Sequence, residues 1–336
     1  MRPRDIAMSV FGTEFCDQFS VARYVNDAWH KDGLQPLAPI PMHPASHVLH
    51  YASTCFEGFK AYRWEDGSVH VFRLNDHVAR MQKSAASLRL PVPDADILRD
   101  MVLSLVDASR DAVPAYPGAL YLRPTLIGTL QNIGAAASPS TEAMLFVLAS
   151  PVGDYFAGGM KPLKILIDDQ NARSTRQLGS TKTGGNYAAA LSPTLDAKAK
   201  YGVDQVLFCP TSDVQETGAA NFLIIGEDSV LTKPLDASFL HGMTRASTLT
   251  IAKDLGYDVA ERDFTVDDLL TLISDHDAAL SGTAASLTPI GEMIFQDKRY
   301  AVNSGSDFSS TLKLRDALAD IHCGRRDDKH GWLTSV

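Results

Sequence analysis

The sequence predicts a mixed α/β protein that is built from two domains. Its 336 residues are enough for two hydrophobic cores, and strand-like and helix-like segments occur in both halves. Between the halves, residues 150–162 carry glycines and prolines that interrupt the apolar periodicity, which is typical of a connection. We therefore expect an N-terminal α/β domain over residues 1–152, an interdomain loop over 153–162 and a C-terminal domain over 163–336.

The first half begins with strands and turns. Residues 1–45 are irregular and proline-rich toward their end, and residues 68–73 form a short β-prone run. A helix should follow, because Asn75 or Asp76 can cap it and Pro91 would stop it. Its apolar side chains recur at helical spacing: Val78, Met81, Ala85 and Leu88.

A second helix and two buried strands complete this half. The helix is expected over residues 94–113, and strands are expected over residues 119–127 and 143–149, where apolar residues dominate. The stripe of the helix contains Ile97, Met101, Leu105 and Ala108.

The second half opens with a strand over residues 163–168 and a polar loop over residues 169–180. A helix should then run from Asn186 to Gly202, although Pro193 must bend or interrupt it. The further elements are expected as strands at 205–209, 221–225 and 278–280, and as helices from Thr244 to Gly256 and over 312–321.

Composition excludes several classes of function. A formal charge of −9 and a pI near 5.5 argue against a nucleic-acid surface, which needs a basic stripe. The sequence has no run of about eighteen apolar residues, so no membrane helix is expected. The start of the chain does not resemble a signal peptide. The four cysteines are far apart and without a Cys-x-x-Cys pair, so we expect reduced thiols in the cytoplasm and no zinc site.

One lysine and one acid suggest pyridoxal phosphate chemistry. Lys182 lies among small residues, where its amine could form a Schiff base with the cofactor aldehyde. Glu216 precedes an apolar strand, and a carboxylate beside a pyridinium favours the ionised forms of both. Taken alone, a surface lysine and a hairpin glutamate are the commoner interpretations of these residues.

Three further segments could bind a phosphate. The amides of Met243 and Thr244 open a helix, whose positive end attracts anions. Residues 281–285 offer small side chains and hydroxyls, and Arg80, on the polar side of the first helix, could add a positive charge. A helix start, a strand-end turn and a solvated arginine are the simpler alternatives. His241 has no second ligand at zinc spacing, so no metal site is expected.

Seven segments occur in order from about residue 47 onward: 50–51 with 56–63, 72–73 with 80–81, 121–124, 182–187, 216–222, 242–245 and 281–289. Together they resemble the branched-chain amino-acid aminotransferases, which are class IV, fold-type IV pyridoxal phosphate enzymes. The end of the chain at 327–332 is similar too. The resemblance implies a smaller N-terminal α/β domain, a larger C-terminal domain with a β-barrel-like core, a cofactor at the domain interface and a homodimer.

The resemblance implies a role for each matching residue. Lys182 would carry the cofactor and act as the base, Tyr187 would bind the ring oxygen and Glu216 the ring nitrogen. Leu240 would pack against the ring. The phosphate would be held by Arg80, Met243, Thr244 and Thr283.

The resemblance also implies a substrate site. Tyr121 and the amides of Thr283 and Ala284 would receive the α-carboxylate, and Arg123 would accept the distal carboxylate of glutamate. An aliphatic pocket would be lined by Phe56, Tyr51, Tyr155 and Ala284.

The implied activity is ping-pong transamination between L-leucine, L-isoleucine or L-valine and 2-oxoglutarate. An aminodeoxychorismate lyase-like enzyme, a D-amino-acid or amine transaminase and a non-enzymatic binding module are the alternatives. Residues 56–63 favour the branched-chain group over the other enzymes. Two positions depart from the family's pattern: His241 replaces a usual proline, and Ala219 lacks a hydroxyl that some members have there.

Overall fold

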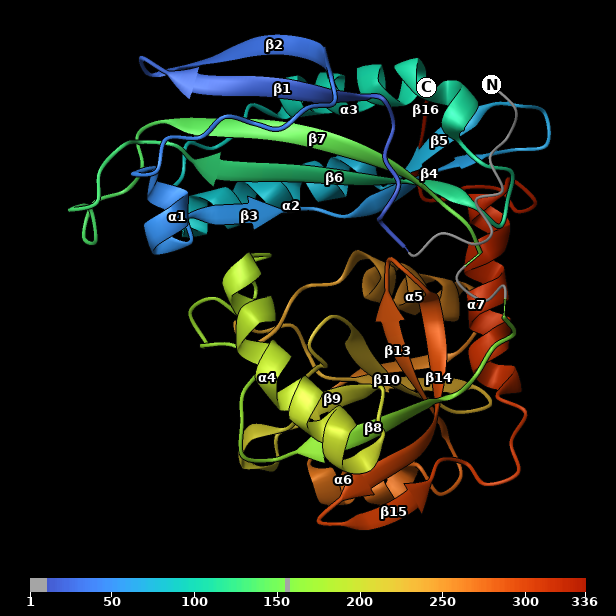
Figure 1. Ribbon diagram of the computed structural model, residues 1–336. Coiled ribbons are helices and arrows are strands. Elements are labelled where there is room, and N and C mark those ends of the chain that lie inside the picture. Colours follow the sequence, from blue (N-terminus) through green and yellow to red (C-terminus); the bar gives the residue numbers. More distant parts are fainter. Residues whose placement is uncertain (1–10, 155–157) are drawn as a thin grey trace. The chain divides into compact units, whose positions relative to one another are not determined.

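The computed structural model describes residues 11–154 and 158–336 (Figure 1). These residues form two compact units. Unit 1 contains the described residues up to 154 together with 181–184 and 321–336, and unit 2 contains 158–180 and 185–320. The domain boundaries that the sequence suggested stay a prediction.

Unit 1 is built on an eight-stranded sheet whose ladders are all antiparallel. The strand order is β16-β5-β4-β6-β7-β1-β2, and β3 also pairs with β6. The strands are β1 Gln18–Val25, β2 Ala28–Pro36, β3 Thr54–Phe56, β4 Phe59–Arg63, β5 Val69–Phe72, β6 Ala119–Gly128, β7 Ala143–Val152 and β16 Leu333–Ser335. The strands predicted within 1–45 and at 68–73, 119–127 and 143–149 are therefore confirmed.

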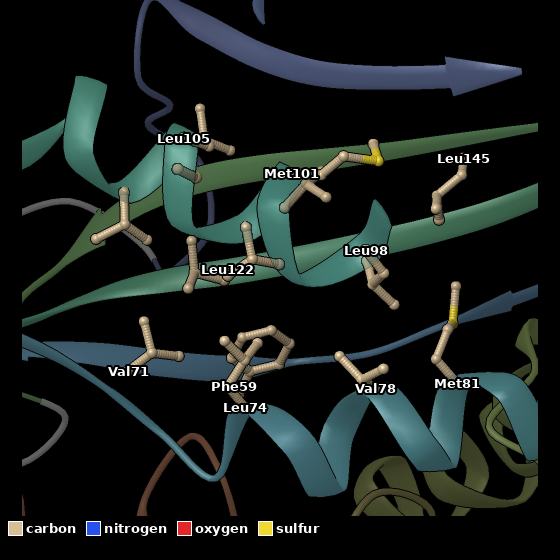
Figure 2. Packing of buried hydrophobic residues seen from close by; sticks show 14 of the residues in the cluster. Phe59, Val71, Leu74, Val78, Met81, Leu98, Met101, Leu105, Leu122 and Leu145 are labelled. Atoms are coloured by element: carbon tan, nitrogen blue, oxygen red, sulfur yellow. The ribbon is translucent and has the colours of Figure 1, made fainter. Parts of the chain in front are cut away.

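Two helices cover one face of this sheet, α2 (Leu74–Ser87) and α3 (Ala95–Ala108), while the short α1 (His47–Tyr51) precedes β3. Figure 2 shows the core that they enclose. Buried side chains of the helices meet alternate residues of the strands, since side chains of a strand point to opposite faces in turn. The labelled residues of this core are Phe59, Val71, Leu74, Val78, Met81, Leu98, Met101, Leu105, Leu122 and Leu145.

The helix starts show where sequence signals were right and wrong. Asp94 caps α3, since its side chain accepts hydrogen bonds from the amides of Asp96 and Ile97. The expected caps of α2 are wrong, because Arg73 is the capping residue with a positive φ of 54°. Asn75 and Asp76 lie inside the first turn, where an acid also favours the helix. Helix α3 ends at Ala108 and a 3-10 turn follows at Arg110–Ala112.

Unit 2 is built on a second eight-stranded sheet, with both parallel and antiparallel ladders. The order is β12-β11-β10-β13-β14-β8-β9, and β15 pairs with β14. Isolated bridges join Leu207 to Thr217 and Glu216 to Asn221, so the segment after β9 leads back to β10. The strands are β8 Leu163–Asp168, β9 Gln205–Phe208, β10 Asn221–Ile225, β11 Ser229–Thr232, β12 Asp258–Glu261, β13 Asp277–Gly282, β14 Ser286–Phe295 and β15 Lys298–Ala301.

Four further helices lie in the described residues: α4 Gly184–Tyr201, α5 Met243–Asp254, α6 Val266–Leu272 and α7 Ser309–His322. The helices predicted at 186–202, 244–256 and 312–321 are confirmed as α4, α5 and α7, whereas α6 was not predicted. Pro193 lies inside α4 and does not interrupt it. The carbonyl left without its usual donor belongs to Ala189, an exposed residue, so water can replace the lost hydrogen bond. Within the described residues, no helix is both long and apolar enough to cross a membrane.

Candidate active site

Lys182 is fixed to unit 1 through its backbone. Its amide donates to Ser84 Oγ at 3.1 Å, and its carbonyl accepts from the amide of Phe56 at 3.0 Å. The next residue, Thr183, donates its hydroxyl to the carbonyl of Thr54 at 2.7 Å. The ammonium nitrogen Nζ lies 5.0 Å from the centroid of the Phe56 ring. The backbone at Lys182 is therefore held in place by hydrogen bonds to β3 and α2. A side chain that must reach one reacting atom requires such a fixed backbone.

A buried ionic cluster lies on α2 and the segment before β4. Arg80 donates to both carboxylate oxygens of Glu57, from Nε at 2.7 Å and from Nη2 at 2.8 Å. His77 Nδ1 lies 2.7 Å from Glu57 Oε2. Burial alone would raise the pKa of Glu57, but Arg80 and then His77 hold it well below its ordinary value. Burial lowers the pKa of His77 against the opposing effect of Glu57, which favours the neutral imidazole.

The expected position of Arg80 on the polar side of its helix is wrong, because only 7% of its surface is exposed. Glu57 makes that burial possible, since a guanidinium away from water needs a paired acid. The forked contact also fixes the plane of the guanidinium. Arg80 is thus a buried cation whose orientation is fixed by Glu57, and not a solvated arginine.

Tyr121 and Arg123 lie together on β6, on the face opposite to the core residue Leu122. Arg123 Nη2 donates to the Tyr121 hydroxyl at 2.8 Å, and the guanidinium carbon lies 4.7 Å from the centroid of the Phe56 ring. Among the residues that the structure describes, the buried Arg123 Nε has no hydrogen-bond acceptor. Gly58 leaves room for the tyrosine, because a β-carbon there would overlap the Tyr121 hydroxyl. This group of residues offers donors to a carboxylate beside an aromatic surface.

The other two aromatic residues that are predicted to line the pocket are Tyr51 and Tyr155. The hydroxyl of Tyr51 donates to the carbonyl of Ile133, which ties it to the loop after β6. Tyr155 lies outside the described residues. Their roles stay predictions.

Glu216 in unit 2 is a buried carboxylate with donors on both oxygens. Its Oε1 accepts from Arg173 Nη1 at 2.5 Å and from the amide of Leu240 at 3.0 Å. Its Oε2 accepts from Asn221 Nδ2 at 3.0 Å, and the same amide group donates to the carbonyl of Leu240 at 2.8 Å. The side chain is therefore held in one orientation by β10, by the segment before α5 and by Arg173.

The residues expected to hold a phosphate lie in unit 2 at the start of α5 and after β13. Gly242 precedes α5, so the amides of Met243 and Thr244 belong to its first turn. A β-carbon on Gly242 would overlap Asn221 Oδ1, so this backbone can approach β10 only as glycine.

The segment after β13 also has an unsatisfied group. Ser281 pairs with Asn221 across the strands, and its buried Oγ has no hydrogen-bond partner in the described part of the chain. Thr283 and Ala284 form the half-buried turn to β14. Small residues, helix amides and an unpaired hydroxyl suit a phosphate group.

His241 stands where the resemblance implies a proline, and a hydrogen bond restrains it. Its Nε2 lies 2.8 Å from the carbonyl of Asp236, which closes the loop before α5. Asp236 itself accepts from the amide and hydroxyl of Ser238. The loop is thus held by hydrogen bonds and not by a proline ring. Within the described residues, no group of three or more His, Cys, Asp or Glu side chains could hold a metal.

Sequence reasoning missed Glu57, His77 and Arg173. Glu57 lies within the motif at 56–63, but nothing in that motif indicates which cation it would meet. Arg173 lies in the polar loop 169–180 and carries no pattern at all. The only signal for such residues in the sequence is a charged side chain beside an apolar strand that no motif accounts for.

The chain is similar to known proteins over nearly its whole length. Residues 54–293 match the family described as Amino-transferase class IV. The chain is 38% identical to a probable branched-chain-amino-acid aminotransferase of Streptomyces coelicolor, with 97% of this chain and 92% of the relative covered.

Solved structures give the same result. A branched-chain amino acid aminotransferase from T.th., crystallised with pyridoxamine 5'-phosphate, is 27% identical at a TM-score of 0.79, over 94% of this chain and 97% of that one. The same enzyme complexed with N-(5'-phosphopyridoxyl)-L-glutamate is 28% identical at a TM-score of 0.76, over 93% and 97%.

Proposed function

The chain belongs to the amino-transferase class IV family, and from this premise we propose that it is a branched-chain-amino-acid aminotransferase that uses pyridoxal 5'-phosphate. It exchanges the amino group between L-leucine, L-isoleucine or L-valine and 2-oxoglutarate, and it forms branched 2-oxo acids and L-glutamate. The substrate class is inferred from the relatives. The observation that supports the cofactor is the environment of Glu216. A buried carboxylate that is oriented by Arg173, Asn221 and the Leu240 amide is suited to bind a protonated ring nitrogen.

The residues present fit this cofactor. Gly242 and the first amides of α5 leave a place for a phosphate, and the buried Ser281 hydroxyl lacks a partner that a phosphate oxygen could supply. Arg80, with its guanidinium fixed by Glu57, adds the positive charge. We propose that the phosphate is bound by Arg80, Met243, Thr244 and Thr283, with Leu240 against the ring.

When bound, pyridoxal phosphate supplies an electron sink and carries the amino group. Lys182 would hold the cofactor and, once released, its Nζ would take the proton from the substrate α-carbon and deliver it to the cofactor's former aldehyde carbon, as a positioned base. Glu216 would keep the ring nitrogen protonated. The Tyr187 hydroxyl would donate a hydrogen bond to the ring oxygen.

The substrate is oriented by carboxylate recognition. Tyr121 and the amides of Thr283 and Ala284 bind the α-carboxylate. Arg123 binds the second carboxylate of glutamate, and its unpaired buried Nε is the donor that such a group would satisfy. We propose an aliphatic pocket that is lined by Phe56, Tyr51, Tyr155 and Ala284.

The test is an assay of L-leucine with 2-oxoglutarate, scored by glutamate. A lyase of the same fold forms no glutamate from this mixture, and a D-amino-acid transaminase responds to D-alanine instead. A protein without activity that stays colourless with added cofactor would be a binding module. Borohydride reduction followed by peptide mass spectrometry should place the cofactor on Lys182. A label elsewhere would remove this lysine from the mechanism.

We propose that the enzyme acts as a homodimer in the cytoplasm, without nucleic-acid or membrane partners. The formal charge of −9 supports the absence of a nucleic-acid surface. Light scattering of the purified protein should give twice the chain mass of 36.4 kDa, and a monomer mass would contradict the dimer.

A further inference from the structure

Arg173 in unit 2 is the largest by volume of the side chains that the described residues bury almost completely. Only 2% of its surface is exposed. Burying a guanidinium is costly unless an acid pairs with it, and a buried pair seldom stabilises a fold more than well-packed apolar residues would. Arg173 has its acid, since Nη1 lies 2.5 Å from Glu216 Oε1. Such an arrangement needs a reason other than stability.

The other contacts of Arg173 point to the same place. Nε donates to the carbonyl of Gly218 at 3.2 Å. This bond fixes the guanidinium against the backbone that directly follows Glu216. The guanidinium carbon lies 5.5 Å from the centroid of the Tyr187 ring. One side chain therefore contacts both residues that are proposed to bind the ring nitrogen and the ring oxygen.

The donors to Glu216 have different effects. Asn221 and the amide of Leu240 are neutral, so they orient the carboxylate. Arg173 is the donor that also brings a positive charge, and an opposite charge at hydrogen-bond distance favours the ionised acid. A carboxylate and a pyridine nitrogen that face each other compete for one proton. A cation behind the carboxylate biases that proton toward the nitrogen.

We infer that Arg173 is a positioning residue that keeps Glu216 ionised, so that the shared proton stays on the cofactor's ring nitrogen. This inference rests on the proposed function, because it needs pyridoxal phosphate bound opposite Glu216. It assigns to the loop 169–180 a part in the reaction, although Arg173 itself touches neither substrate nor cofactor in this account.

The experiment uses the full-length protein loaded with pyridoxal phosphate that is ¹⁵N-labelled in the ring. The nitrogen NMR signal distinguishes a protonated ring from a neutral one, independently of turnover. We expect a protonated ring in the wild type and a neutral or mixed signal in Arg173→Gln. In the same variant, kcat for L-leucine should fall by about tenfold to a hundredfold, the effect of losing a hydrogen bond to a charged group. The KM should change little.

Three variants make the result specific. Arg173→Lys keeps the charge and should keep the protonated ring. Adding Arg173→Gln to Glu216→Gln should lower kcat less than about threefold further, because Arg173 acts through the acid. Arg245→Gln breaks the ion pair of another buried arginine of unit 2, with the exposed Glu261, and should leave the ring signal protonated.

A protonated ring in Arg173→Gln would overturn the inference alone. Where that variant does not fold, a neutral ring in Arg173→Lys would overturn it, since the positive charge is then still present. Full additivity of the two glutamine substitutions would also contradict it. A wild-type protein that binds no pyridoxal phosphate would overturn the proposed function, and this inference with it.

Discussion

Gly58→Ala tests whether the position of the Tyr121 hydroxyl controls the reaction. A β-carbon on Gly58 would overlap this hydroxyl and lie 2.9 Å from Tyr121 Cζ. Because carbon atoms pack at about 3.5 Å or more, the ring tip must move by roughly 0.6 Å at Cζ and further at the oxygen. A displacement of about 1 Å from the productive geometry can reduce a rate on the order of 100-fold. We therefore expect kcat/KM for L-leucine to fall by about this factor, or about 2.7 kcal/mol.

The assay is steady-state glutamate formation, with cofactor absorbance as a check that pyridoxal phosphate stays bound. Gly158→Ala is the matched control, since a β-carbon there meets no atom of the described residues within 4 Å. Its kcat/KM should stay within about twofold of the wild type. In a Tyr121→Phe background the alanine should cost less, because the overlapping oxygen is gone. A Gly58→Ala enzyme with an unchanged kcat/KM would refute the idea that Tyr121 receives the α-carboxylate.

Three further substitutions test the packing and the buried charges. Glu57→Gln removes the carboxylate from Arg80 and should lower the free energy of unfolding by about 3–5 kcal/mol; a loss below about 1 kcal/mol in urea unfolding would contradict this. Burial, reinforced by the charge of Lys60, lowers the pKa of His322 to about 3. The folded imidazole then stays neutral while the unfolded one binds a proton below its ordinary pKa near 6.5, so stability is lost as the pH falls through this window. The loss should be about 2 kcal/mol between pH 7 and pH 5, and His322→Phe should remove it; equal acid sensitivity in both proteins would exclude His322 as the cause. Leu105→Ala empties a fully buried position and should cost about 3–5 kcal/mol in the same measurement, whereas a cost under about 1 kcal/mol would mean that the core closes around the gap.

Most elements were predictable because their signals are local. The apolar stripes of α2 and α3 and the β-prone runs of β6 and β8 depend on neighbouring residues, which the sequence displays directly. Helix ends were less certain. Arg73 takes the place of the expected caps of α2 because the chain turns at this residue from β5 into the helix, with a positive φ. That turn depends on the path of the chain and not on a local sequence signal.

The sequence by itself determined which chemistry the chain can perform. It carries Lys182, Tyr187 and Glu216 in the order of one family, and residue identity and order are one-dimensional information. Only the tertiary structure decided which charges meet. Glu57 finds Arg80, and Arg173 finds Glu216, across 23 and 43 residues of chain. Such pairs have no period or propensity, because they depend on where strands and loops return in space, and burial then makes each pairing decisive for the charge of its site.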